Sequence, residues 1–144
     1  MALESTSMIP ADARFRCVIP VRWGDLDAQN HVNNTLYFRF LEEARVQLFN
    51  AAGLPIPTKK VVLLVHETCD FIKPIEYPAT VSVILGVKKI GTSSLTFQSR
   101  IECHSDANVI YSKGCNVVVG ACASTGKPQP WSTAELEALA SCFK

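Results

Sequence analysis

Hydrophobic and polar residues alternate in the first patterned segment of the chain. Every second residue from position 15 to 23 is apolar: Phe15, Cys17, Ile19, Val21 and Trp23. A period of two predicts a β-strand with one face on a core. Pro20 cannot donate a hydrogen bond to a neighbouring strand, which predicts an edge strand or a bulge at that point.

The apolar period changes to three or four residues after position 35. The residues that follow it are Tyr37, Phe40, Leu41, Ala44, Leu48, Ala51 and Ala52. Gly53 and Pro55 come next, and both residue types commonly follow the end of a helix. The pattern predicts one long helix over about 35–52. Further apolar residues lie on its other side, so we expect protein on most sides of this helix.

Four more strands are predicted, at about 61–71, 81–90, 95–103 and 109–123, with a turn at Gly91 joining the middle two. Ser132 and Glu135 have the spacing of a capping box, which predicts a short helix over 132–142. The order predicts an α+β fold in which a curved antiparallel sheet, its last four strands in a meander, wraps around the long helix. We expect residues 1–144 to form a single domain, with a flexible leader at about 1–12.

The open edges of the predicted sheet indicate whether the chain is a monomer or an oligomer. One small sheet cannot cover a helix with so wide an apolar surface, and its outer strands would remain open. Natural proteins normally pair or cover open strand edges. We therefore expect at least a dimer.

Composition narrows the classes of function. The chain has 144 residues, 48% of them hydrophobic, and a net charge of +1, which offers no general attraction for nucleic acid. No apolar run approaches the roughly 18 residues of a membrane span, and no secretion signal is visible, so we expect a cytoplasmic protein. The cysteines are scattered without metal-binding spacing, and we interpret them as core residues in a reducing compartment: Cys17, Cys69, Cys103, Cys115, Cys122 and Cys142.

The segment 23–37 concentrates the reactive side chains. It places two carboxylates, one imidazole and four side-chain amides between a strand end and a helix start. The first N–H groups of a helix are unpaired and stabilise an oxygen that gains negative charge. A carboxylate beside them would supply a nucleophile, or a base for water, and would complete the parts needed for acyl transfer. This chemistry needs no metal and no cofactor.

The same segment carries a family resemblance. Asp25-Leu26-Asp27, then His31-Val32-Asn33-Asn34, then Tyr37 and Glu42-Glu43-Ala44-Arg45 resemble the hotdog-fold thioesterases of the hydroxybenzoyl-CoA thioesterase type. Three later segments are also similar: Phe71-Ile72-Lys73-Pro74, Gly91-Thr92-Ser93-Ser94 and Gly126-Lys127-Pro128. In that family the sheet wraps a central helix, dimers pair their sheets edge to edge, and active sites lie at the dimer interface. The resemblance implies a hotdog fold, an acyl-CoA substrate, and a homodimer or a dimer-of-dimers tetramer.

Roles for individual residues follow from the resemblance. It makes Asp27 the catalytic carboxylate, as nucleophile or general base, and the backbone N–H near Asn34 the group that polarises the thioester carbonyl. His31 occurs in the HVNN subgroup and in plant acyl-carrier-protein thioesterases, and it would orient Asp27 or bind substrate. Further candidates for substrate binding are Tyr37 for the acyl group, Glu42 at the active site of the dimer, and Lys88, Lys89 and Ser94 for the CoA phosphates.

Simpler roles and other functions remain open. Asp25 and Asp27 could be turn residues that bond their own backbone, and Asn33 or Asn34 would make a good helix N-cap. An acyl-carrier-protein thioesterase is one alternative function, although Gln29 stands where the plant enzymes have asparagine. A hotdog dehydratase or hydratase is a second, although its usual motifs are absent, and a non-catalytic acyl-CoA-binding protein is a third.

Overall fold

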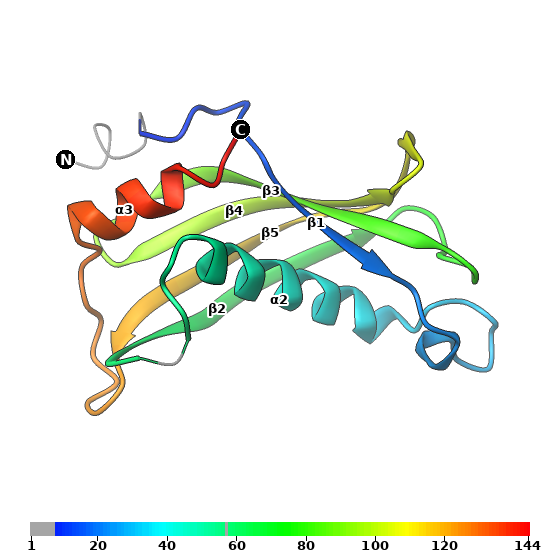
Figure 1. Ribbon diagram of the computed structural model, residues 1–144. Helices are drawn as coiled ribbons and strands as arrows, with labels where there is room; N and C mark the ends of the chain where they lie inside the picture. Colours follow the sequence, from blue (N-terminus) through cyan, green and yellow to red (C-terminus); the bar gives the residue numbers. More distant parts are fainter. Residues whose placement is uncertain (1–7, 57) are drawn as a thin grey trace.

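A single curved sheet and one long helix make up most of the molecule (Figure 1). The computed structural model describes residues 8–56 and 58–144. The elements in chain order are β1 (Phe15–Pro20), the 3-10 turn η1 (Trp23–Asp25), α2 (Asn34–Ala51), β2 (Lys60–Phe71), β3 (Thr80–Ile90), β4 (Ser94–Cys103), β5 (Asp106–Cys122) and α3 (Thr133–Ala140). Within the described residues, five antiparallel strands form one sheet in the order β1-β3-β4-β5-β2. The predicted α+β arrangement is confirmed.

The strand order corrects one prediction. A meander is right for β3, β4 and β5 but wrong for β2, which pairs with β5 at the far edge of the sheet. Because β1 occupies the free side of β3, the chain must cross from one edge of the sheet to the other between residues 71 and 80. Periodicity shows which face of a strand is buried but not which strand lies beside it. The edge position predicted from Pro20 is confirmed for β1.

The core lies between α2 and the facing side of the sheet. The helix buries the predicted stripe of Tyr37, Phe40, Leu41, Ala44 and Leu48. These side chains meet the inward residues of the strands, among them Val83, Leu85, Phe97, Ile101 and Val118. The opposite face of α2, with Arg39, Glu43 and Gln47, is exposed in the single chain, so the protein expected there is not supplied by this chain.

The expectation for Trp23 is wrong, and that for the cysteines holds in part, because Cys17 lies in the core and Cys69, Cys103 and Cys142 pack against it. Trp23 was expected on the core face of the first strand, yet it is 75% exposed because the strand ends at Pro20 and the chain turns into η1. The cysteines are all free, but only Cys17 is buried and the other five are half-buried.

The ends of the chain pack against the sheet. The predicted flexible leader falls partly on residues 1–7, which lie outside the described residues, and Ile9 within its remainder is buried in the core. At the other end, Ser132 caps α3, with Glu135 completing the predicted capping box. Trp131, just before this helix, packs over the main chain at Gly120.

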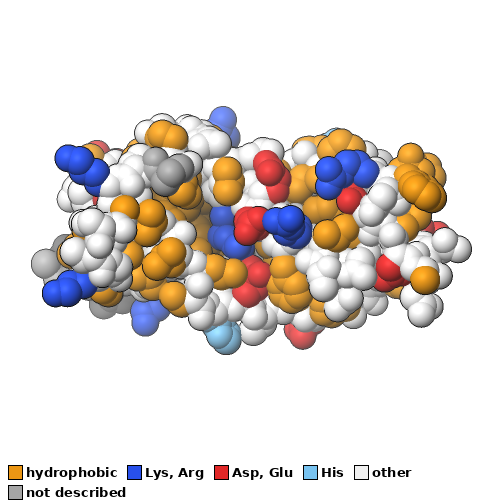
Figure 2. Space-filling view, turned by 90° about the horizontal axis from the view of Figure 1, so that it is seen from below, with side chains coloured by type: hydrophobic (Ala, Val, Ile, Leu, Met, Phe, Trp, Pro, Cys, Tyr) orange, Lys and Arg blue, Asp and Glu red, His pale blue; other side chains and the backbone are white. Residues whose placement is uncertain are grey.

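The side of the molecule formed by α2 and β2 combines charged and apolar groups (Figure 2). Arg45 of α2 donates a 2.7 Å hydrogen bond to Glu67 of β2, and the two side chains are each 9% exposed. Further along β2, the edge-strand residues Leu63, Leu64 and Val65 are 46%, 45% and 59% exposed. An ion pair therefore joins the helix to this edge, next to apolar side chains that the described residues leave about half exposed.

Candidate active site

A tight turn before α2 carries the candidate carboxylate. Leu26 and Val32 form an isolated antiparallel bridge, and the N–H of Asp27 donates to the carbonyl of His31 at 3.0 Å. Asn30 completes the turn with φ of 59°, a left-handed conformation that asparagine tolerates better than most residues. The chain thus reverses between Asp27 and His31 and enters the helix directly afterwards.

Both oxygens of the Asp27 carboxylate accept hydrogen bonds from this segment. The backbone N–H of Gln29 donates to Oδ1 at 2.8 Å, and the side-chain amide of Asn33 donates to Oδ2 at 3.1 Å. The other end of the Asn33 amide accepts from the N–H of Thr35 at 2.9 Å, so Asn33 is the N-cap of α2. One side chain therefore holds the carboxylate and starts the helix.

The second aspartate of the motif has a structural position. Asp25 is 4% exposed, and its carboxylate accepts hydrogen bonds from the N–H and the guanidinium of Arg22 at 2.8 and 3.2 Å. Its carbonyl accepts the N–H of Asn33. These contacts fix the path of the chain from η1 to the helix start.

Asn34 provides the first N–H group of the helix. In the described part of the chain, no acceptor takes up this N–H. The residue lines the same cavity as Asp27, which has a volume of about 290 Å³. The residue with the carboxylate and the residue that begins the helix, at its positive end, consequently line one cavity.

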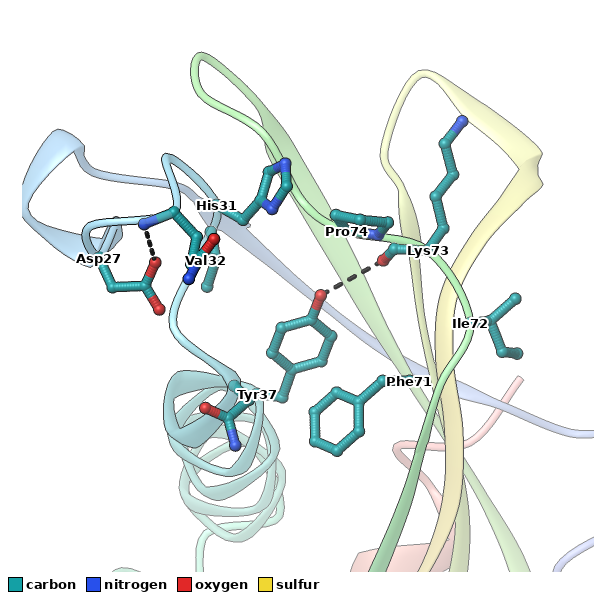
Figure 3. Close-up of a pocket in the computed structure, with 10 residues that line it drawn as sticks. Asp27, His31, Val32, Tyr37, Phe71, Ile72, Lys73 and Pro74 are labelled. Atoms are coloured by element: carbon teal, nitrogen blue, oxygen red, sulfur yellow. Dashed lines mark hydrogen bonds between the residues drawn. The ribbon is translucent and has the colours of Figure 1, made fainter.

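The opposite wall of this cavity comes from the end of β2 and the residues after it: Phe71, Ile72, Lys73 and Pro74. Figure 3 shows Tyr37 between the two walls, with its hydroxyl donating to the carbonyl of Lys73 at 3.3 Å. Its ring meets Phe71 edge to face, with 4.9 Å between ring centroids. Burial raises the pKa of Tyr37, so this phenol stays neutral at physiological pH.

His31 lines the cavity but does not contact the carboxylate. Figure 3 shows its ring directed toward Pro74 and away from Asp27. The charged group closest to it is Glu76, at 3.9 Å from Nε2. The groups that orient Asp27 are therefore Gln29 and Asn33.

Four of the other predicted site residues lie away from this cavity within the chain. Glu42 is on the exposed side of α2, 3.5 Å from Arg39. Lys88, Lys89 and Ser94 flank the turn between β3 and β4, where the carbonyl of Thr92 accepts the N–H of Trp131 beside α3. That turn and the Asp27 turn are at opposite ends of the sheet.

The sequence interpretation missed part of the site. The sequence marks segment 71–74 as similar to the family and as the end of a strand, but does not identify it as a cavity wall. It predicts Asn33 only as a cap, although the six-residue separation from Asp27 across a turn is the signal that could have paired them. Among the described residues, no three His, Cys, Asp or Glu side chains gather in a way that could hold a metal ion.

Comparison with known proteins decides the family. The sequence pattern of the thioesterase-like superfamily matches residues 21–139. The chain belongs to this superfamily. Its turn, helix start and cavity wall all fall within the matched residues. Across the described residues, no helix is long and apolar enough to span a membrane.

Solved structures show the same fold. A structure named "PA2801 protein, a putative Thioesterase from Pseudomonas aeruginosa" is 35% identical, with a TM-score of 0.81, and the match covers 84% of this chain and 94% of that one. A structure named "A putative acyl-CoA thioesterase from Xanthomonas campestris" is 33% identical, with a TM-score of 0.71 over 81% and 97% of the two chains. This thioesterase-like chain therefore has the hotdog fold that the resemblance implied.

A relative known by sequence is named "Putative esterase", from Aquifex aeolicus. It is 30% identical over 81 residues, and the match spans 54% of this chain and 63% of that protein. Thioesterase chemistry is supported by the superfamily match and by the names of the two solved structures, whereas this relative's name extends only to an esterase.

Proposed function

We propose that this protein hydrolyses acyl-CoA thioesters to a free acid and CoA. The observation that carries the proposal is that Asp27 lines one cavity with Asn34, whose N–H has no acceptor among the described residues. The name of the Xanthomonas structure, which includes acyl-CoA, supports this substrate class.

Two mechanisms fit this arrangement. With Asp27 as nucleophile, its oxygen bonds to the carbonyl carbon, the C–S bond breaks, and CoA leaves as the thiolate before water hydrolyses the mixed anhydride. With Asp27 as general base, it takes a proton from water, the water oxygen bonds to the carbonyl carbon, and the C–S bond breaks so that CoA leaves as the thiolate. In both, negative charge builds on the carbonyl oxygen, and the Asn34 N–H at the helix start stabilises it. Single turnover in ¹⁸O-labelled water tests for a nucleophilic route in which water attacks the aspartyl carbon of the anhydride, because only that route leaves ¹⁸O in the Asp27 carboxylate. Attack of water at the acyl carbon puts ¹⁸O in the product acid in either mechanism.

Replacement of Asp27 tests the proposal. We expect Asp27→Asn to lower the rate of thiol release from a panel of acyl-CoAs by about 10²- to 10⁴-fold. Asp106→Asn, at the exposed turn between β4 and β5, is the matched control and should retain full activity. Unchanged turnover in Asp27→Asn would refute the assignment. Activity on acyl-carrier-protein substrates alone would favour that alternative, and binding of acyl-CoA without any turnover would favour a binding protein.

We further propose that the chain works as a homodimer or a dimer of dimers. The support is the open β2 edge with its exposed Leu63, Leu64 and Val65, next to the uncovered face of α2. Pairing two β2 strands would bury these side chains and satisfy the free backbone groups of the edge. The cavity walls at Phe71 and Ile72, which are 49% and 55% exposed, would then lie close to a second chain.

A further inference from the structure

A second cavity, on the face of the sheet opposite α2, is lined by positive side chains. Its volume is about 230 Å³, and its lining includes Arg14, Arg100, Lys113 and Gln98, with Ile84 among its apolar contacts. Arg100 and Lys113 are register partners on β4 and β5, and Arg100 is also the partner of Ile84 on β3. None of the described residues that line this cavity is acidic. Three cations, Arg14 just before β1, Arg100 on β4 and Lys113 on β5, thus share one hollow.

Arg14 is held in place by groups outside the cavity. Its Nη1 donates to the carbonyls of Ala11 and Ala13 at 2.7 and 2.9 Å, and its main chain exchanges two 2.9 Å hydrogen bonds with Lys144. The guanidinium lies over Gly86, where a Cβ atom would be only 2.8 Å from Nη1. The glycine leaves the space in which this arginine is fixed.

A buried carboxylate positions the second arginine. Glu102 is 1% exposed, and its two oxygens lie 2.9 Å from Nε of Arg100 and 3.1 Å from Nη1 of Arg16. Nε of Arg100 is buried and forms an ion pair with Glu102 by distance but without hydrogen-bond geometry, while its two terminal nitrogens have no hydrogen-bond partner within the described residues. Because such a guanidinium is already ordered, less conformational entropy is lost when a ligand binds to it.

The local charge balance remains positive. Arg14, Arg16, Arg100 and Lys113 supply the cations, and the carboxylates paired with them are Glu102, beside Arg16 and Arg100, and Asp70, the register partner of Lys113. The chain as a whole carries only +1, so this concentration of positive charge is local. Arginine forks match the geometry of phosphate oxygens, and a phosphate takes up several cations at once.

We propose that this cavity binds a phosphate group, at a site separate from the Asp27 cavity. Arg14 and Arg100 donate fixed N–H groups to it, and Lys113 adds a mobile ammonium. The phosphate belongs either to a free anion or to the nucleotide end of a CoA molecule, and both present the same chemistry to these three side chains. Phosphate binding at this site does not depend on hydrolysis, so it can be tested separately from the activity proposed above.

Calorimetric titration of the intact protein with inorganic phosphate, and separately with 3′,5′-ADP, tests the site. We expect both probes to bind and Lys113→Gln to weaken binding about tenfold. Lys127→Gln, which removes an exposed lysine from the loop before α3, is the charge-matched control and should bind as the original protein does. Tighter binding of 3′,5′-ADP identifies the nucleotide as the source of the phosphate, and equal binding identifies the free anion.

Gly86→Ala separates a built site from general charge attraction. The new methyl group displaces the Arg14 guanidinium without altering any charge, and a flexible arginine can move aside while the strand keeps its place. We expect this variant to lose affinity while its melting temperature changes little. Absence of phosphate and 3′,5′-ADP binding at millimolar concentration, or equal binding by the Gly86→Ala, Lys113→Gln and original proteins, would overturn the proposal.

Discussion

Asn33 is predicted to have two separable contributions, one to the rate of hydrolysis and one to stability. Its Nδ2 donates to Asp27 at 3.1 Å, while its Oδ1 accepts from the N–H and the hydroxyl of Thr35 at 2.9 and 2.6 Å. Asn33→Ser keeps an oxygen that can cap the helix but removes the donor to the carboxylate. Asn33→Ala removes both. A comparison of the two variants therefore separates the contribution of Asn33 to the rate from its contribution to stability.

The magnitudes follow from these contacts. A hydrogen bond to a charged group contributes about 1.5–3 kcal/mol, and the lower end applies here because Asp27 is only half-buried. Its loss predicts a fall in kcat of about tenfold in both variants. Loss of an N-cap costs about 1 kcal/mol, so Asn33→Ala should also melt about 3 °C lower, whereas Asn33→Ser should melt almost normally.

The assays are thiol release from a saturating acyl-CoA and thermal unfolding of the same preparations. Asn33→Asp gives a third comparison, because it retains a good cap but places a second carboxylate against Asp27. We expect it to be stable and slower than Asn33→Ser. Full activity in the Asn33→Ser and Asn33→Asp proteins, or losses of activity that simply follow the losses of stability, would refute the reasoning.

Three other predictions concern stability, assembly and thiol chemistry. Arg45→Met leaves the buried carboxylate of its partner on β2 without a counter-charge, and urea unfolding should show a loss of about 3 kcal/mol; a loss below 1 kcal/mol would mean that the ion pair contributes little. Val65→Lys, on the open edge of β2, should lower the mass measured by light scattering to that of a monomer. Val18→Lys, on the β1 edge, is the control and should leave the mass unchanged. The same mass for both variants would argue against pairing through β2. Hydrogen bonds, led by that from the Ser124 hydroxyl, lower the pKa of Cys122 to about 6, so this thiol becomes thiolate as the pH rises through 6. Iodoacetamide at pH 7 should label Cys122 first, which peptide mass spectrometry would verify; equal labelling of all exposed thiols would contradict it.

The extent of most elements was predictable because it depends on local pattern, although β1 ends at Pro20 rather than at Trp23. The apolar stripe of α2 and its cap at Asn33 lie within one stretch of sequence, and the observed helix, Asn34–Ala51, is displaced by one residue from the predicted range. The position of β2 was not predictable in this way. Its apolar run is compatible with pairing on β3 or on β5, and the choice depends on β1 already filling the free side of β3.

The candidate site was also predictable only where its residues are close in sequence. Asp27 and Asn34 are close in sequence, so the motif predicted that they would meet, whereas the contact of Asn33 with Asp27 was not predicted and the wall at 71–74 reaches them only through folding. The N–H of Val32 donates to the carbonyl of Ile75 at 2.9 Å, and this contact joins the two walls. No pattern in either segment encodes that pairing.

The predicted CoA-binding residues lie far from the Asp27 cavity of their own chain. Lys88, Lys89 and Ser94 lie at the end of the sheet where β2 begins at Lys60. The ammonium of Lys60 donates to the carbonyl of Pro130, and the next residue, Trp131, donates its N–H to Thr92 in that turn. The Asp27 cavity lies at the other end of the same strand, at Phe71. Two β2 strands paired antiparallel about a two-fold axis would set the first end of one strand beside the last end of the other. In the proposed dimer, the turn that carries Lys88, Lys89 and Ser94 in each chain would thus approach the cavity of the other, and their expected role depends on that assembly.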